Sequence, residues 1–440
     1  MSLLCCTLPL LLAFSVCLAA PALPLAWSVP AFDSTPLAGI APLANGSTTV
    51  IFYGTAAEGG YNHGAMLHYA DGLLTVSWKN GVGQQGEDAA GQRVRYSQST
   101  DGLTWSPSAL LFPSLNTSAL PVALFAGPFA VLNGRLYASA TPAVLASGDA
   151  QGSQFCLWPD GVDPRNAGPP GHRQPVGVLL LRRVLGLGQL GPAFWAADTV
   201  PSGFAPASAA AGLLTANQTD AQTQGDAALL RPALPSLPCG DPASSGTLKC
   251  EAVAGGGQDY EHLPAAAALA NERTHWQVPA SSSSAGWAGA DVLAYRSHSS
   301  ALWASARAPG SSAWSQVALT PIPNDDSNVN AGRLPDGRVF LAANAVPHRG
   351  RNPLTLALAR DGLNFTSIRW LMSCTAMPQA NSTCRARGPG GASGGPSYPQ
   401  ALSVVHPAPL QLQGFYVVAT NNKEDVVVAR FPWSALEEVE

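Results

Sequence analysis

The amino-acid sequence predicts an all-β fold made of repeated units, a β-propeller whose blades are four-stranded sheets. Charged residues make up only 11% of the 440 residues, and the chain contains 44 glycines and 38 prolines. The apolar residues occur in short runs rather than in heptads, which favours many strands joined by turns. One short hairpin motif also recurs, with a spacing typical of propeller blades.

The recurring motif is an Asp-Gly turn followed by an aromatic residue three positions after the glycine. It occurs in Asp101–Trp105 and in Asp361–Phe365, and a weaker copy runs from Ser305 to Trp314. The aspartate can accept hydrogen bonds from backbone N–H groups inside the turn, the glycine supplies a positive φ, and the aromatic ring packs between sheets. These roles account for Asp101 and Asp361, so we expect them to be structural rather than catalytic.

The spacing of the motif predicts the number of blades. Trp314 and Phe365 lie 51 residues apart, and Trp105 and Trp314 lie 209 residues apart, about four such steps. A period near 50 indicates blades of four strands. We therefore expect a single domain over residues 45–436 with six blades, placed at Tyr61–Ser106, Leu120–Ala197, Phe204–Leu269, Asn271–Gln316, Asn328–Trp370 and Ser397–Trp433.

Some parts of this blade map are less regular than others. The third blade is poorly defined, and three segments rich in Gly, Pro, Ser and Ala are expected to be long loops or insertions: Gln151–Arg173, Ala205–Gln258 and Met377–Pro396. The β-rich segment Thr48–Tyr53 precedes the first blade. We expect it to pair with Val426–Arg430 in the last blade, because neither terminal strand then keeps a free edge.

The N-terminus has the pattern of a secretory signal peptide. Leu8–Ala20 is an apolar run that ends in small residues, long enough for a signal peptide and short for a membrane span. We expect a signal over residues 1–22, cleaved between Ala20 and Ala26; the alternative is a membrane anchor. No later run is long and apolar enough to span a bilayer, so we expect a secreted protein without membrane contact after cleavage. Five N-x-S/T sequons are compatible with that route.

Five cysteines remain after the expected cleavage, in two close pairs and one single residue. We expect Cys239 to bond Cys250 and Cys374 to bond Cys384, leaving Cys156 free. The clustered Cys/His spacing of a zinc site is absent, and we expect no metal or cofactor. The net charge of −4 and a pI near 6.1 provide no basic stripe, which argues against nucleic acid as a partner.

The turns and the strongest repeat resemble a known superfamily. The Asp-Gly turns resemble the Asp-box of the sialidase (neuraminidase) superfamily, shortened by one residue. The stretch Thr320–Asn324, Gly332–Val339 and Arg351–Leu358 looks like the BNR-repeat propellers of that superfamily, and Tyr398–Gln400 with Asn422–Asp425 looks like their last blade. The resemblance implies a six-bladed propeller of the sialidase type that acts on, or binds, extracellular carbohydrate, with its site where the innermost strands meet.

Two arginines are candidates for binding an acidic sugar. Arg296 ends the apolar strand that begins at Asp291, and Arg351 precedes the apolar strand Leu354–Leu358. In a chain this poor in charge, each needs an anionic partner, either a ligand or a structural ion pair. They resemble the second and third arginines of the sialidase triad, which hold the substrate carboxylate. The first arginine is missing from Tyr61–Met66, where His63 could offer a donor or a pH-dependent charge.

The resemblance also implies the reacting groups. Tyr398 begins the last blade, where the superfamily carries its tyrosine nucleophile, although it can equally be a packed core aromatic residue. Glu272 is the candidate base for this tyrosine, with Glu261 as its rival. Asp88 is the candidate general acid, with Glu87 as an alternative; a solvated loop acid would explain it equally well.

These residues define the function that we expect and its competitors. The leading hypothesis is a secreted sialidase-like exo-glycosidase that acts on acidic sugars with a tyrosine nucleophile. The missing first arginine favours a non-catalytic propeller that binds glycans or another extracellular partner. A third hypothesis is a polysaccharide lyase, or a glycosidase for another acidic sugar, on the same scaffold, because a fold alone does not determine a function.

Overall fold

The fold is described from a computed structural model of the chain. The residues that it describes are 23–33, 37–55, 57–81, 89–115, 121–145, 173–175, 178–201, 203–233, 271–283, 286–296, 300–311, 314–325, 327–347, 351–374, 376–377, 394–405 and 407–439.

In the described ranges, strands dominate and form five sheets of at least four strands. The first sheet contains β3 (Tyr61–Ala70), β4 (Leu73–Gly81), β5 (Arg93–Ser99) and β6 (Ala109–Phe112). The second contains β7 (Val122–Leu132), β8 (Arg135–Leu145), β10 (Leu180–Gly186), β11 (Gln189–Trp195) and β12 (Leu214–Thr215), and β9 (Arg173–Pro175) pairs with β8.

The remaining three sheets come from the second half of the chain and one early strand. One contains β13 (Asn271–Gln277), β14 (Asp291–Arg296), β15 (Ala301–Arg307) and β16 (Ala318–Pro323). The next contains β17 (Asn330–Arg333), β18 (Val339–Ala343), β19 (Leu354–Ala359) and β21 (Ser367–Met372). The last contains β22 (Pro396–Val404), β23 (Gly414–Asn421), β24 (Asp425–Phe431) and β2 (Ser47–Phe52), and a short helix α4 (Trp433–Glu437) follows it.

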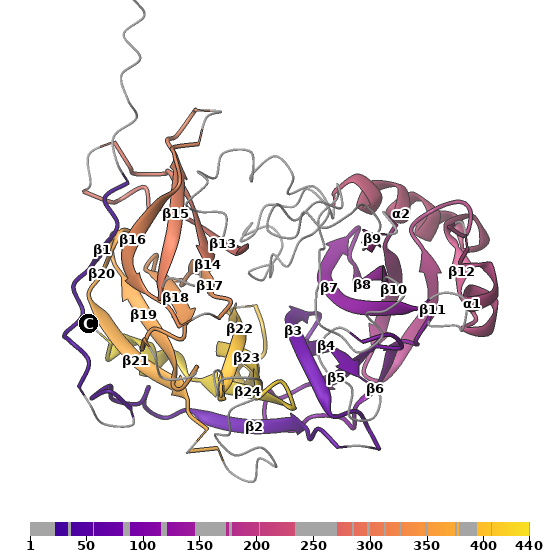
Figure 1. The fold of residues 1–440 in the computed structure, drawn as a ribbon, viewed down its shortest axis with the longest axis horizontal. Helices are drawn as coiled ribbons and strands as arrows, with labels where there is room; N and C mark the ends of the chain where they lie inside the picture. Colours follow the sequence, from indigo (N-terminus) through magenta and orange to yellow (C-terminus); the bar gives the residue numbers. More distant parts are fainter. Residues whose placement is uncertain are drawn as a thin grey trace, which may run out of the picture.

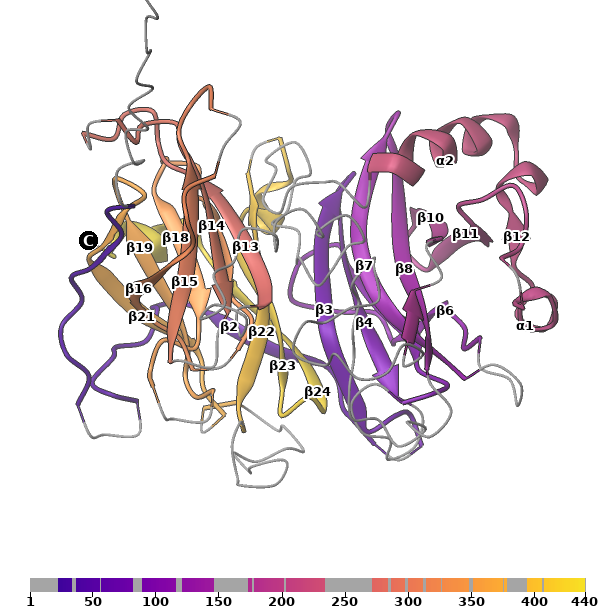
Figure 2. The ribbon, with the colours of Figure 1, turned by 45° about the horizontal axis from the view of Figure 1, so that its top comes forward.

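The five sheets stand side by side in an arc, with the first strand of each toward the middle (Figures 1 and 2). In each sheet the strands follow one another in chain order outward from this innermost strand, and neighbours pair antiparallel. Three strands are exceptions: β2 joins the last sheet out of chain order, β9 pairs beside the main path, and β12 pairs parallel with β11. Neighbouring innermost strands contact one another in the series β13, β17, β22, β3 and β7. This arrangement is that of propeller blades.

Neighbouring innermost strands are linked by hydrogen bonds in which a backbone amide of one strand donates to a side-chain oxygen of the next. The amide of Leu67 on β3 donates to the Gln400 Oε1 on β22. The amide of Ala401 on β22 donates to the Asn330 Oδ1 on β17 at 2.9 Å, and the amide of Ala331 on β17 donates to the Thr274 Oγ1 on β13 at 2.8 Å. All three bonds run in the same direction around the arc, and they satisfy edge amides that have no strand to pair with.

The Asp-Gly turns have the structure that the sequence predicts. The Asp101 Oδ1 accepts hydrogen bonds from the amides of Thr104 at 2.7 Å and Leu103 at 2.8 Å. These amides, that of Thr104 foremost, lower the pKa of the Asp101 carboxyl. The Asp361 Oδ1 likewise accepts hydrogen bonds from the two amides after Gly362, and Phe365 is fully buried.

The weaker copy of the motif is also a true structural repeat. The Ser305 Oγ donates to the Ser315 carbonyl at 2.6 Å, just as the Ser97 Oγ donates to the Ser106 carbonyl at 2.7 Å in the first blade. In both blades the second serine also accepts a hydrogen bond from the backbone amide that follows the first serine. The two hairpins therefore close by the same contacts although their sequences differ.

The early strand β2 completes the last sheet. It pairs antiparallel with β24, and Val50 lies opposite Val427. This confirms the pairing predicted from Thr48–Tyr53 and Val426–Arg430. The strand β24, which would otherwise form an edge, is covered on its outer side, as the need to protect edge strands requires.

The segment expected to form the third blade is different in the described part. Residues 204–233 contain α1 (Ala205–Ala210), a 3₁₀ turn over Ala216–Gln218 and α2 (Ala221–Ala233), which lie at the outer side of the second sheet (Figure 2). The expectation of a long loop or of a third blade was wrong for this described segment, because alanine, which is abundant here, has the highest helix propensity. The alternative expectation, an insertion, is compatible with the two helices. Residues 234–270 lie outside the described residues, so the count of six blades is not confirmed.

Buried polar contacts fix α2 to the second sheet. Asp220 caps its first turn, since the Thr223 amide donates to Asp220 Oδ1 at 2.9 Å. Asp226 on α2 is only 1% exposed and accepts hydrogen bonds from the Tyr137 hydroxyl and the Asn133 amide group, both at 2.7 Å. The helix is therefore part of the folded domain rather than a surface loop.

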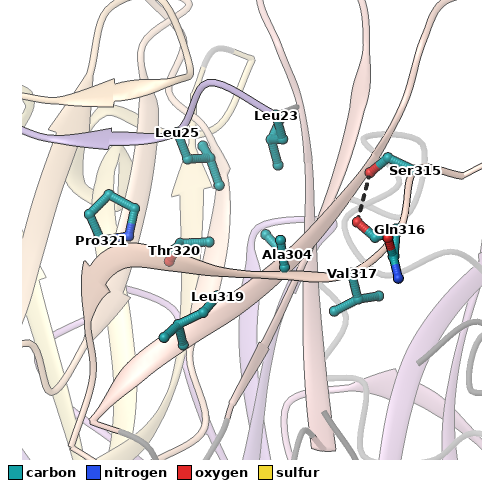
Figure 3. A pocket seen from close by; sticks show the side chains of 10 residues that line it. Leu23, Leu25, Ala304, Ser315, Gln316, Val317, Leu319, Thr320 and Pro321 are labelled. Carbon is teal, nitrogen blue, oxygen red and sulfur yellow. Dashed lines mark hydrogen bonds between the residues drawn. The ribbon is translucent and has the colours of Figure 1, made fainter. Parts of the chain in front are cut away.

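The N-terminal segment crosses from one sheet to the next. β1 (Ala26–Trp27) pairs parallel with β20 (Asn364–Phe365), and Leu25 is buried in the core between two blades. Leu23 and Leu25 point toward the edge strand β16, where they and residues 315–321 line a cavity of about 350 Å³ (Figure 3).

One of the expected cysteine pairs is represented in the described residues. Cys374 is disulfide-bonded and 8% exposed. Its expected partner Cys384, and Cys156, Cys239 and Cys250, lie outside the described residues, so the pairing scheme stays a prediction.

A buried histidine makes the stability of the first two blades depend on pH. His68 on β3 is 3% exposed and stacks on Phe129, with ring centroids 5.6 Å apart. Burial lowers the pKa of the His68 imidazole from 6.5 to about 4. Because the folded-state pKa is depressed, the unfolded chain binds the proton first as pH falls. Stability is therefore lost as the pH decreases from about 6.5 to about 4.

We expect His68→Gln to remove this component of the pH dependence. Relative to the variant, the wild-type chain should lose up to about 3 kcal/mol of unfolding free energy between pH 7 and pH 4. Urea denaturation at several pH values measures the difference. A difference between the two proteins that is constant over this range would show that His68 does not titrate as burial requires.

Candidate functional site

Tyr398 lies at an irregularity in the innermost strand of the last blade. The register of β22 against β23 shifts between Ser397 and Gln400, so Tyr398 falls in a β-bulge. Bulges re-aim side chains and occur often beside functional sites. The tyrosine is 3% exposed, and its amide donates to the Ser327 Oγ at 3.4 Å.

Three cationic side chains meet the ring of Tyr398. The Arg296 Nη1 donates to the Tyr398 hydroxyl oxygen at 2.5 Å, and the Arg296 Cζ lies 5.5 Å from the ring centroid. The Arg351 Cζ lies 5.3 Å from the same centroid, and the Lys423 Nζ lies 5.7 Å from it. All three cations are within the range of a cation–π contact, roughly 6 Å. The two arginines singled out in the sequence therefore meet at the tyrosine singled out with them.

His63 completes the described surroundings of the ring. Its imidazole meets Tyr398 edge-on, with ring centroids 4.0 Å apart and an interplanar angle of 65°. His63 lies on β3, is 2% exposed, and borders a register shift between His63 and Met66. The histidine thus reaches the same centre from the first blade, where the sequence predicts it in place of an arginine.

Three residues of this cluster have left-handed backbone conformations. The φ angles are +66° at Arg351, +57° at Tyr398 and +58° at Lys423. For residues other than glycine and asparagine this region is sparsely populated, and strain of this kind gathers at functional sites. The convergence of three such residues on one ring is therefore an independent indication of function.

Hydrogen bonds and close packing hold Arg351 in place. The Asn344 Nδ2 lies within hydrogen-bond distance of the carbonyl oxygens of Arg351 at 2.7 Å, Pro396 at 3.0 Å and Pro353 at 3.2 Å. The chain also passes so closely that a Cβ on Gly395 would lie 2.8 Å from the Arg351 carbonyl oxygen. Arg351 is therefore packed directly against the start of the strand that carries Tyr398.

Comparison with known proteins agrees with this geometry. Residues 281–408 match the family model described as "BNR repeat-like domain", and this range includes Arg296, Arg351 and Tyr398. A solved sialidase superposes with a TM-score of 0.62 over 93% of this chain, at 15% sequence identity. Residues 281–408 thus match a BNR repeat-like domain, and the fold of the chain is similar to that of a solved sialidase.

Other solved structures show weaker similarity to this chain. The sialidase of Trypanosoma rangeli in complex with sialic acid has a TM-score of 0.46 and 10% identity, and covers 94% of this chain and 60% of its own length. The intramolecular trans-sialidase from Ruminococcus gnavus matches with a TM-score of 0.46 and 11% identity. The match covers 88% of this chain and 97% of the trans-sialidase. The chain spans about a third (35%) of the sialidase with the TM-score of 0.62, and no curated protein sequence matches it.

Asn62, on the innermost strand of the first blade, is a structural residue. This residue is fully buried, and its amide N–H and Nδ2 donate to the carbonyl oxygens of Lys423 at 2.7 Å and Glu424 at 2.6 Å. Its Oδ1 accepts hydrogen bonds from Trp78 Nε1 at 3.0 Å and Asn80 Nδ2 at 2.8 Å. The strand β3 thus uses Asn62 to hold a turn of the last blade.

The expected carboxylates are only partly placed. Glu272 lies on β13 in a register shift between Asn271 and Arg273, and Asn271 pairs with Arg296, so its backbone is beside the cluster. Its side chain, and all of Glu261, Glu87 and Asp88, lie outside the described residues. Their roles as base and general acid stay predictions.

Two further results concern classes of function. Among the residues that the structure describes, no group of three His, Cys, Asp or Glu side chains is arranged to hold a metal ion. In the same part of the chain no helix is both long and apolar enough to cross a membrane.

Lys423 is the functional candidate that sequence reasoning missed. It lies in the turn between β23 and β24, and Asn422–Asp425 was noted only as part of a family resemblance. The available signal was a lysine at a position of a tight turn where glycine or asparagine is usual, which indicates that the side chain has a role of its own.

We expect the amide of Asn344 to be needed for the geometry of the site. Asn344→Asp replaces the donating NH2 by a carboxylate oxygen against three carbonyl oxygens, and should destabilise the fold by more than about 3 kcal/mol. Asn344→Leu, which leaves the carbonyls unpaired without adding charge, should cost about 1–3 kcal/mol. Urea denaturation at pH 7 measures both variants. Equal losses for the two would contradict a role of Asn344 as hydrogen-bond donor.

Proposed function

We propose that this chain is a secreted sialidase-like exo-glycosidase that acts on acidic sugars, with Tyr398 as its nucleophile. One observation carries the proposal: the hydroxyl of Tyr398 accepts a hydrogen bond from Arg296, and the Arg351 guanidinium lies over the same ring. The fold of a solved sialidase supports it, as does the T. rangeli sialidase, which was solved in complex with sialic acid.

The two guanidiniums suit the carboxylate of an acidic sugar. Arg296 is 8% exposed and Arg351 is 5% exposed, so both cations are largely removed from water. A guanidinium binds a carboxylate through two parallel N–H···O bonds, and such bonds are strong where water is excluded. An acidic sugar held this way would place its ring beside the Tyr398 hydroxyl.

A phenol is a suitable nucleophile for a sugar that bears a carboxylate at its anomeric carbon. A carboxylate nucleophile would be repelled there, whereas neutral Tyr398 is not. In the proposed reaction the phenol oxygen bonds the anomeric carbon and Glu272 takes the phenol proton, while the glycosidic bond breaks and Asp88 protonates the departing oxygen. Water then attacks the anomeric carbon while the bond between this carbon and the Tyr398 oxygen breaks; Asp88 accepts a proton from the water, and Glu272 returns a proton to Tyr398.

The proposal includes the closed architecture and the secretory route. A sixth blade between α2 and β13 would complete the ring of innermost strands and with it the site. Secretion rests on the N-terminal apolar run and on the sequons, of which Asn45 and Asn217 are exposed.

A second candidate function is a propeller that binds acidic glycans without cleaving them. The observation that favours it is the burial of Tyr398, which is only 3% exposed. A phenol buried in this way can pack beside a bound sugar as part of a binding surface rather than react as a nucleophile.

We expect Tyr398→Phe to separate these two functions. An enzyme should lose at least about a thousandfold in kcat, because its nucleophile is gone. A binding protein should instead keep its affinity for the acidic sugar within a few-fold. The assays are hydrolysis of an aryl sialoside and titration calorimetry with sialic acid, with wild type as reference. Hydrolysis that survives in the variant would exclude Tyr398 as the nucleophile.

We expect activity on acidic sugars, but weak activity on ordinary sialosides. Losing one partner of a buried charge pair costs about 2–5 kcal/mol, so Arg296→Ala should lower kcat/KM by about thirtyfold to several thousandfold. If protonated His63 replaces part of the missing arginine, activity should rise as the pH falls toward about 6. The comparison is kcat/KM for aryl sialosides, uronic-acid glycosides and neutral glycosides.

Two results would contradict this substrate preference. Efficient cleavage of a sialoside that is unaffected by His63→Ala would show that another group replaces the arginine. A preference for neutral glycosides would remove the role of the two arginines as a carboxylate clamp.

A further inference from the structure

We propose that Lys423 binds the substrate carboxylate together with Arg296 and Arg351, as the third cation of the site. The inference rests on the proposed function, because it concerns the ligand of the same site. It assigns the third carboxylate contact to a turn of the last blade rather than to the first blade.

The position of Lys423 is the first observation. Its Nζ lies 5.7 Å from the centroid of the Tyr398 ring, close to the 5.5 Å of Arg296 and the 5.3 Å of Arg351. A carboxylate beside this ring is therefore within reach of cations from three different segments of the chain. Arginine offers two parallel donors in a fixed fork, whereas lysine offers a compact charge on a flexible stem.

The backbone of Lys423 is the second observation. Lys423 has a φ of +58° in the turn between β23 and β24, directly after Asn422 with a φ of +54°. Asparagine tolerates this conformation well, but for lysine it is strained, and glycine would adopt it freely. A lysine at this position has to be explained by its side chain rather than by the geometry of the turn.

The support of the turn is the third observation. On one side, Asn62 of β3 donates to the carbonyl oxygens of Lys423 and Glu424. On the other side, Asn422 and Gly395 exchange two hydrogen bonds, at 2.7 Å and 3.1 Å, just before the strand that carries Tyr398. The turn is thus fixed between β3 and β22, and the lysine is held at a set place relative to the tyrosine.

Asn62 shows why the cation is not on the innermost strand at this position. The strand β3 cannot present a cation at position 62, because the side-chain amide there makes four hydrogen bonds to buried side chains and backbone carbonyls. A buried network of this kind is stable only when each member is satisfied. Asn62 consequently contributes by positioning Lys423, and not by contacting the ligand itself.

The test uses the full-length protein and the sialidase inhibitor DANA, with the methyl ester of its carboxylate as the neutral probe. Titration calorimetry should show that Lys423→Met binds DANA about ten- to a hundredfold more weakly than wild type. Lys423→Arg, which keeps the charge, should bind within a few-fold of wild type. The ester should bind weakly to wild type and should be insensitive to Lys423→Met.

Lys423→Gly separates binding from folding. It relieves the left-handed backbone, so its Tm should be no lower than that of wild type, while its affinity for DANA falls as in Lys423→Met. Asp71→Gly is the matched control, since Asp71 has a φ of +50° in the hairpin turn between β3 and β4, away from the site. The control should keep the wild-type affinity for DANA.

The outcomes distinguish this inference from the proposed function. If Arg296→Ala weakens DANA binding but the Lys423 variants do not, the inference is wrong and the proposed function stands. If affinity in the Lys423 variants falls only in parallel with a lower Tm, Lys423 is a structural residue and the inference is also wrong. If wild type binds neither DANA nor sialic acid, the proposed function fails and the inference fails with it.

Discussion

The arrangement of the blades depends on how the edge of each innermost strand is satisfied. These strands approach one another without forming a continuous sheet. The backbone amides on the free edge of each innermost strand therefore need acceptors from a neighbouring blade. Gln400, Asn330 and Thr274 supply them, one for each junction from β3 to β13. Tyr398 lies two residues before Gln400, and Glu272 lies two residues before Thr274. The same contacts that space the blades therefore also hold the backbone on which Tyr398 and Glu272 lie.

The site gathers charge in a chain that has little of it. Arg296, Arg351 and Lys423 are brought together around a single phenol, and polar residues that bear no net charge position them, chiefly Asn62 and Asn344. Amides suit this task because each offers a donor and an acceptor without the desolvation cost of another ion. Rigid neutral support combined with few, convergent cations is a suitable arrangement for recognising an anion.

The sequence predicted the repeated elements far better than the irregular ones. The Asp-Gly turns, the strand runs and the pairing of Val50 with Val427 follow from local rules of turn chemistry and edge protection. The alanine-rich helices α1 and α2 were missed because low-complexity composition was interpreted as loop. Arg296, Arg351, Tyr398 and His63 were found through family resemblance together with charge scarcity, and their meeting could not be derived from spacing.

The positions missed at the site share one physical property. The bulges at Tyr398 and Glu272 and the left-handed turn at Lys423 depend on contacts between distant segments, which no local pattern records. Sequence reasoning rests on regular periods of two or 3.6 residues, and these residues interrupt the period. Departures from local preference are expected where a protein positions functional groups.

The pairing of β2 with β24 has a consequence for how the chain is made. β2 is synthesised before every blade, whereas its partner strand appears only near the C-terminus. Each intermediate blade can form from neighbouring segments as it is synthesised, but the last one requires the two ends of the chain to meet. Contacts of such long sequence separation form slowly, and an unpaired strand is exposed to association with other chains in the meantime. The final step of folding is therefore also the step at which a nascent chain is most vulnerable to misassembly.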